Sequence, residues 1–155
     1  MVKPIDLKEK FPHLSGAPIV EAALDIRIVP SAQWDEITLQ RELKQLLPDF
    51  PHVETLREAR VQMPPSQPGK PAFEDVGCVG LKFHSNDNLN IAQFNKGAFV
   101  FSRLKPYADW GKFSQEALRL WAIYCELFKP AEVRRIGLRF INRIVIERET
   151  VELAD

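Results

Sequence analysis

The sequence predicts an α+β domain in which a mainly antiparallel sheet carries two amphipathic helices on one face. Several short stretches alternate apolar and polar residues with the period of two that a half-buried strand requires. Two longer stretches repeat apolar residues at the spacing of three or four that one helical face requires. Two short turns rich in Asn, Asp and Gly join three consecutive strand candidates, which favours antiparallel neighbours. The predicted order is β-α-β-β-β-β-α-β.

The composition is that of one ordinary globular domain. The chain has 155 residues, of which 45% are hydrophobic and 27% charged, enough to bury a core. Lys plus Arg and Asp plus Glu both number 21, so no overall charge draws the chain to nucleic acid or to an anionic membrane. We divide the chain into a polar N-terminal arm (1–17), a single α+β domain (18–147) and a C-terminal tail or truncated continuation (148–155).

The sequence indicates a cytoplasmic protein without a membrane segment. Residues 1–16 hold no apolar run long enough for a signal peptide, and no run of about 18 apolar residues occurs anywhere. The two cysteines, Cys78 and Cys125, stand in no CxxC pattern. We therefore expect buried, reduced thiols and neither a disulfide framework nor a zinc site.

The first half of the chain predicts a strand, a helix and a second strand. Residues 18–29 alternate cleanly, and Pro30-Ser31 follows, with Ser31 as the expected helix N-cap. Pro48 ends the helix, and residues 53–63 alternate again before the proline-rich loop at 64–71. The expected apolar stripe of this helix is Trp34, Ile37, Leu43, Leu46 and Leu47.

The second half predicts a meander, a long helix and a last strand. The meander strands are 76–84, 89–95 and 98–104. Asp109 is the expected N-cap of the helix, and Pro130 follows the end of that helix. The helix stripe is Phe113, Ala117, Leu120, Tyr124, Leu127 and Phe128. The last strand, 133–147, is expected to turn Ile136, Leu138, Phe140, Ile144 and Ile146 toward the core. Its resemblance to the first strand hints at a duplication that is cut short.

The polar side of the sheet is the first candidate site. Arg27, Arg139 and Arg143 are expected there, near the acids Glu21 and Asp25. One interpretation is a platform for an anion or a nucleic acid, because guanidinium groups suit phosphate. The other is a solvated face whose arginines pair with the two carboxylates. We favour the second interpretation, because opposite charges on neighbouring strands commonly offset each other.

The turn before the second helix is the other candidate site. Arg103, Lys105 and Tyr107 lie between a strand end and a helix start, where loops often carry ligand-binding groups. These three residues can hold an anion beside the helix N-terminus. The simpler interpretation, which we favour, is that Pro106 and Tyr107 shape and pack the turn.

The sequence carries no catalytic or metal signature. The three histidines form no metal-binding pattern, and no Walker A, GxSxG or Rossmann motif is present. We expect no cofactor and no metal. The favoured function is a non-enzymatic binding or interaction module, whose free sheet face or edge strand meets a protein partner or a second copy. The alternatives are binding of nucleic acid or an anion through the arginine face, and an enzyme whose site needs a missing C-terminal half.

Three long, irregular stretches carry a family resemblance. They are Ala17 to Ala22 (APIVEA), Phe99 to Trp110 (FVFSRLKPYADW) running into Phe113-Ser114, and Arg135 to Ile144 (RIGLRFINRI). Together they resemble a sporadically distributed family of uncharacterised prokaryotic proteins. Members are usually longer, so the resemblance implies that this chain corresponds to their N-terminal portion. It implies no established activity, cofactor or catalytic residue.

Overall fold

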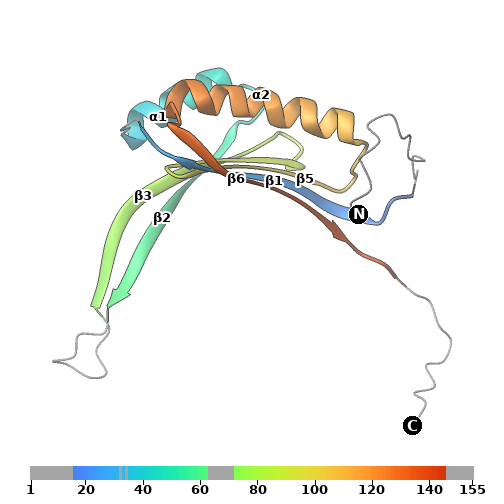
Figure 1. The fold of residues 1–155 in the computed structure, drawn as a ribbon, viewed down its shortest axis with the longest axis horizontal. Helices are drawn as coiled ribbons and strands as arrows, with labels where there is room; N and C mark the ends of the chain where they lie inside the picture. Colours follow the sequence, from blue (N-terminus) through green and yellow to red (C-terminus); the bar gives the residue numbers. More distant parts are fainter. Residues whose placement is uncertain (1–15, 32, 34, 63–71, 146–155) are drawn as a thin grey trace, which may run out of the picture.

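The structure, a computed structural model, describes residues 16–31, 33, 35–62 and 72–145. Six antiparallel strands form one sheet in the order β2-β3-β4-β5-β1-β6, and both helices cover the same face (Figure 1). The elements are β1 (Ile19–Val29), α1 (Glu36–Leu46), β2 (His52–Gln62), β3 (Ala72–His84), β4 (Asn90–Asn95), β5 (Ala98–Leu104), α2 (Trp110–Phe128) and β6 (Glu132–Asn142). The predicted fold class and element order are confirmed.

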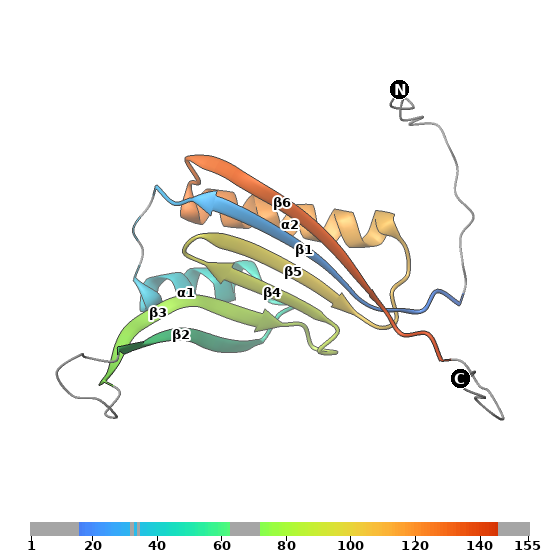
Figure 2. The ribbon, with the colours of Figure 1, turned by 60° about the horizontal axis from the view of Figure 1, so that its bottom comes forward.

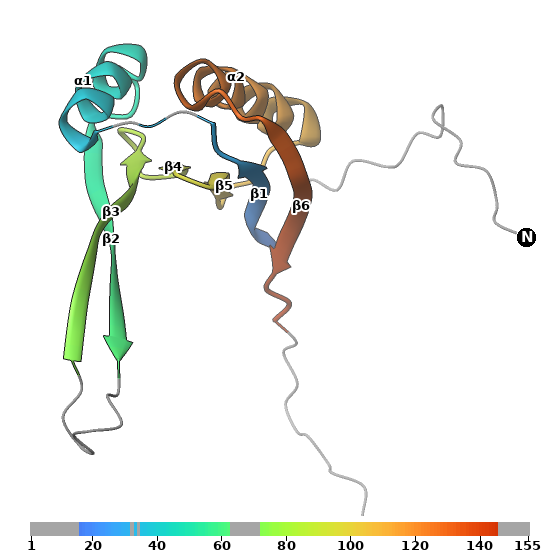
Figure 3. The same cartoon turned by 60° about the vertical axis from the view of Figure 1, so that its left-hand side comes forward.

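The sheet is strongly curved. In Figures 1 and 3 both ends of the sheet bend away from the helices, with the β2–β3 hairpin on one side and β6 on the other. Figure 2 shows the strands from their open side, with β4 and β5 in the middle and β6 and β2 at the edges. The helices therefore lie on the convex face, and the concave face carries no helix.

The core lies between the helices and the four inner strands. Phe94, Phe99 and Tyr124 are fully buried at its centre, with ring centroids 5.7 Å apart for Phe94–Phe99 and for Phe99–Tyr124. The ring of Tyr124 also stacks on that of Phe128, with 4.2 Å between centroids. Aromatic side chains of this size each bury a large apolar surface and so contribute strongly to the stability of the core. This cluster therefore fixes α2 on β4 and β5.

The first helix begins later than the sequence pattern predicts. Asp35, not Ser31, is the N-cap, and its carboxylate accepts a hydrogen bond from the Thr38 backbone N–H at 3.0 Å. The Ser31 hydroxyl donates instead to the Lys129 carbonyl oxygen.

The face that the first helix buries also differs from the predicted stripe. Leu39, Leu43 and Leu47 are buried, whereas 77% of Ile37 and 42% of Leu46 are exposed. Leu39, Leu43 and Leu47 recur at a spacing of four and so share one side of the helix. Trp34 and the loop at 64–71 lie outside the described residues.

The second helix follows the prediction closely. Asp109 caps it by accepting a hydrogen bond from the Lys112 backbone N–H at 2.8 Å. The predicted stripe is buried except for Leu127, which packs on the edge of the core. The helix ends at Lys129, whose φ of 44° places it in the left-handed region. In the described part of the chain, neither helix combines the length and the apolarity needed to cross a membrane.

The last strand lies at the edge of the sheet, where the prediction of its burial is wrong. β6 pairs with β1 in antiparallel register, with Leu24 opposite Leu138. Ile136, Leu138 and Phe140 point to the helix side, as expected, but 67%, 46% and 38% of their surfaces are exposed. α2 packs on β5, through Phe101–Phe113 and Phe99–Trp121, and so leaves β6 uncovered.

The strand also ends earlier than predicted. Its last residue is Asn142, and Ile144, which was expected to face the core, is 74% exposed beyond it. Ile146, expected to face the core as well, lies outside the described residues.

Candidate functional site

The concave face of the sheet gathers the predicted arginines. The register places Arg27 opposite Arg135, and Ala23 opposite Arg139, across the β1–β6 pair. Because paired residues share a face, Arg27, Arg135 and Arg139 all lie on the side without helices. They surround a shallow hollow of about 340 Å³ whose floor includes Ala23, Val100 and Gly137.

Each of these arginines has a carboxylate partner. Arg27 Nε and Arg135 Nη2 both lie 3.0 Å from the Asp25 carboxylate, and Arg139 Nη2 lies 3.9 Å from Glu21 Oε1. The Arg27 hydrogen bond goes to Asp25 Oδ2 at 3.3 Å. Asp25 Oδ1 lies closer to Arg27 but is poorly aligned, so this buried atom makes no hydrogen bond with the described residues. Two carboxylates thus serve three arginines, and this partial offset fits the paired, solvated face that the sequence favours.

The other half of the concave face is balanced in the same way. Lys82 Nζ lies 3.2 Å and His84 Nε2 lies 3.4 Å from the Glu54 carboxylate. The Lys82 hydrogen bond and charge hold the pKa of Glu54 below its usual value. The phenylalanines of the inner strands, Phe83, Phe94, Phe99 and Phe101, are buried on the helix side. Within the described residues, the arginines and Lys82 of this face each have a carboxylate partner, and no row of aromatic rings lies on it, unlike a typical nucleic-acid platform.

Arg143 is separate from the other arginines. It follows the end of β6, and its backbone N–H donates to the Pro18 carbonyl oxygen at 2.8 Å. Its side chain is exposed and does not line the concave hollow.

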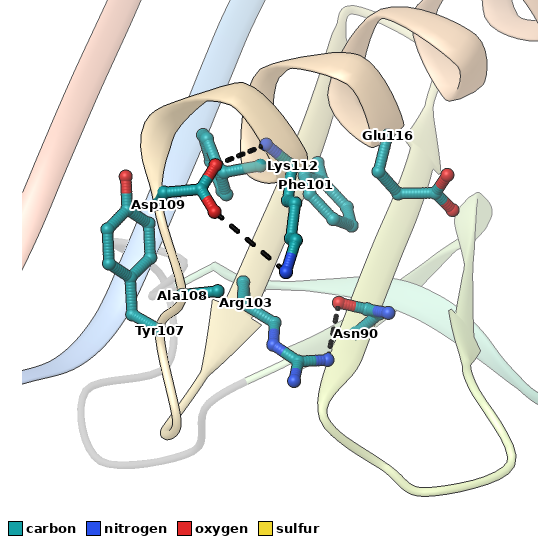
Figure 4. Close-up of a pocket in the computed structure, with 9 residues that line it drawn as sticks. Asn90, Phe101, Arg103, Tyr107, Ala108, Asp109, Lys112 and Glu116 are labelled. Atoms are coloured by element: carbon teal, nitrogen blue, oxygen red, sulfur yellow. Dashed lines mark hydrogen bonds and ion pairs between the residues drawn. The ribbon is translucent and has the colours of Figure 1, made fainter. Parts of the chain in front are cut away.

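The turn before α2 brings together two of its three predicted site residues. Arg103 and Tyr107 line a second hollow of about 310 Å³ at the start of α2 (Figure 4). Lys105 is exposed and does not line this hollow, and its backbone N–H donates to the Val20 carbonyl oxygen at 2.9 Å. Arg103 Nε donates to the Pro106 carbonyl oxygen at 3.2 Å, and Nη1 donates to Asn90 Oδ1 at 3.2 Å.

Tyr107 also packs as the simpler interpretation of the turn requires. Its ring centroid lies 6.2 Å from that of Phe113 and 5.6 Å from that of Phe140. Burial raises the pKa of its phenol. The residue therefore shapes the turn and at the same time forms one wall of the hollow.

The sequence interpretation named an edge strand as a possible contact surface but did not identify which strand it is; in the structure β6 is such an edge strand. Ile136, Leu138 and Phe140, which we call the β6 strip, form an exposed apolar row on the helix side of this strand. Strand alternation predicted their common face, but no local pattern tells a covered edge from an open one. Among the described residues, no group of three or more His, Cys, Asp and Glu side chains is arranged to hold a metal ion.

Comparison with protein family models, with curated proteins and with solved structures finds no match. The family resemblance of the three stretches therefore stays a prediction.

Proposed function

We propose that this protein is a non-enzymatic binding module that works by strand addition at β6, and that its partner is a second copy of the chain. The observation that carries the proposal is the β6 strip, an apolar row on an edge strand with 67%, 46% and 38% of its three residues exposed. Exposed apolar rows at a sheet edge are typical of protein contacts.

The edge itself suits strand addition. β6 has 11 residues and contains neither proline nor lysine, the residues that commonly protect an edge. No strand of the described residues pairs with its outer N–H and C=O groups. Arg135 and Arg139 are drawn across the concave face toward the β1 carboxylates. They therefore do not lie over the edge that a partner strand would approach.

The strip is complementary to itself. In an antiparallel pair centred on Leu138, Ile136 of each copy faces Phe140 of the other, and the two Leu138 side chains meet. On the concave side the same register sets Arg139 opposite Gly137, so no arginine directly faces another. The formal net charge of the chain is zero, so two copies have no overall repulsion to overcome.

The test is the mass of the purified protein in solution. Light scattering over about a hundredfold range of concentration should show a concentration-dependent dimer. Leu138→Lys places a charge at the centre of the contact and should weaken the dimer by about tenfold or more. Ile37→Lys is the matched control, because Ile37 is 77% exposed on α1 and should leave the dimer unchanged.

Two results would contradict the proposal. One is a monomer at every concentration. The other is a dimer that Leu138→Lys and Ile37→Lys affect equally, because that dimer would use another surface.

A further inference from the structure

The hollow at the start of α2 adjoins the β6 strip through the Tyr107–Phe140 contact but has its own chemistry. Its floor is formed by the buried rings of Phe101 and Phe113, and Tyr107 closes one side. Figure 4 shows Lys112 extending from the first turn of α2 toward Arg103 at the end of β5, with Asn90 beside Arg103. Aromatic rings below and polar groups around the rim are typical of small-ligand sites.

The hydrogen-bond donors of this hollow are incompletely used. Arg103 donates from Nε to the Pro106 carbonyl oxygen and from Nη1 to Asn90 Oδ1. Its Nη2 makes no hydrogen bond with the described residues. The Tyr107 hydroxyl makes none with described residues either. Lys112 Nζ lies 4.0 Å from Asp109 Oδ2, and 77% of its side chain is exposed. The Arg103 guanidinium edge and the Lys112 ammonium, whose one ion pair is long, can therefore still donate, whereas the Tyr107 hydroxyl points away from both (Figure 4).

The carboxylates of the hollow are already engaged. Asp109 Oδ1 accepts the Lys112 backbone N–H at 2.8 Å and so occupies the helix N-terminus itself. The Glu116 carboxylate accepts two hydrogen bonds from Arg119, at 2.9 Å and 2.6 Å. The groups of this hollow that can still form hydrogen bonds are donors, which favours a ligand that carries hydrogen-bond acceptors.

We propose that this hollow binds a small organic anion, in which a carboxylate or phosphate is carried on an aromatic body. The oxyanion meets Arg103 Nη2 and Lys112 Nζ, and the aromatic body lies against Tyr107, above the buried Phe101 and Phe113. A volume of about 310 Å³ is at the lower end for ligand pockets and suits one ring with one anionic group. Asp87, 3.9 Å from Arg103 Nη1, keeps the attraction modest.

The experiment uses two probes on the whole chain, phenyl phosphate and 3-phenylpropionate, followed by NMR chemical-shift titration. At least one should bind saturably at the Arg103 and Phe113 resonances, with a Kd on the order of 1 mM. The probe that binds more tightly identifies the phosphate or the carboxylate as the preferred group. Inorganic phosphate and 2-phenylethanol, which each lack one half of the ligand, should bind about tenfold more weakly.

Variants assign the binding to the hollow. Arg103→Gln should weaken the better probe by about tenfold, and Arg41→Gln, at an exposed arginine of α1, should leave it unchanged. Because Arg103 also supports the turn, Lys112→Gln serves as a second variant at an exposed position and should weaken binding by about threefold.

The proposal is overturned if neither probe saturates, or if Arg103→Gln and Lys112→Gln both bind like the unmodified chain. Leu138→Lys should keep full probe binding. A failure of strand addition at β6 is thereby distinguished from a failure of this site.

Discussion

The ring of Tyr107 meets the ring of Phe140 edge to face, with 5.6 Å between the centroids and 83° between the planes. This contact joins the turn before α2 to the edge strand. Tyr107 lines the hollow at the start of α2, and Phe140 belongs to the β6 strip. The two proposed binding surfaces therefore share one aromatic pair as a common wall.

Removing this pair should destabilise the fold moderately. Phe140→Ala is expected to lower the free energy of unfolding by about 1–2 kcal/mol, because the ring is only partly buried and a ring pair contributes about 0.5–1.5 kcal/mol. Urea unfolding at low protein concentration measures the loss. A double-mutant cycle with Tyr107→Leu should give a coupling of about 1 kcal/mol. Independent effects of the two substitutions would show that the contact contributes nothing.

Removing the hydroxyl of Tyr124 should lower the stability of the fold. The residue is fully buried, and its hydroxyl donates to the Asn95 carbonyl oxygen at 2.7 Å. Tyr124→Phe should lower the free energy of unfolding by about 1 kcal/mol. Tyr107→Phe is the control, because the Tyr107 hydroxyl has no such bond within the described residues. Equal losses in the two variants would contradict this assignment.

Stability should fall in alkaline solution. Burial raises the pKa of Tyr124 and Tyr107 above the usual 10.0, and that of Cys78 and Cys125 above the usual 9.0. The native state then keeps protons that the unfolded chain releases, so stability is full below pH of about 9 and is lost as the pH rises above it. Urea unfolding between pH of about 7 and 11 tests this. Tyr124→Phe should make the decline above pH of about 10 shallower.

The β3–β4 pair should not tolerate a side chain at Gly80. A Cβ at this position would lie 2.9 Å from the Asn95 Cα, a backbone atom that cannot move without disturbing β4. Gly80→Ala should cost about 1–3 kcal/mol in the free energy of unfolding. Gly97→Ala is the matched control, because its Cβ would meet no atom within 4 Å. Thermal unfolding compares the two, and equal midpoints would refute the close approach.

The arginine face should not act as a nucleic-acid platform. Arg27, Arg135 and Arg139 already have carboxylate partners, so few counterions would be released on contact with phosphate. Fluorescence anisotropy with single- and double-stranded DNA and RNA should show weak binding that Arg139→Ala leaves unchanged. Tight binding that weakens steeply with salt and with Arg139→Ala would instead support that function.

The sequence predicted the fold well where burial repeats along the chain. The bounds of β5 and the stripe of α2 follow from apolar residues most of which are buried against one core. The start of α1 was harder to predict, because both Ser31 and Asp35 can cap a helix. Only the structure shows that the Ser31 hydroxyl donates a hydrogen bond to the Lys129 carbonyl oxygen, so that Asp35 is the N-cap.

The candidate surfaces were predicted only in part. The alternation of β1 and β6 placed Arg27 and Arg139 on one face beside Glu21 and Asp25, as the structure has them. The exposure of Leu138 depends on how far α2 extends across the sheet, which no local pattern contains. Lys112 escaped notice because folding, and not sequence spacing, brings it to the same hollow as Arg103.

The position of β1 between β5 and β6 affects how the nascent chain folds. β1 leaves the ribosome first among the strands, but its partners are at 98–104 and 132–142. The strands of the β2–β5 meander can pair as soon as they are synthesised, because each is close in sequence to its partner. β1 can pair only after its distant partner strands have been synthesised. Its apolar side, with Ala22, Ile26 and Ile28, therefore stays exposed at least until residues 98–104 have been synthesised.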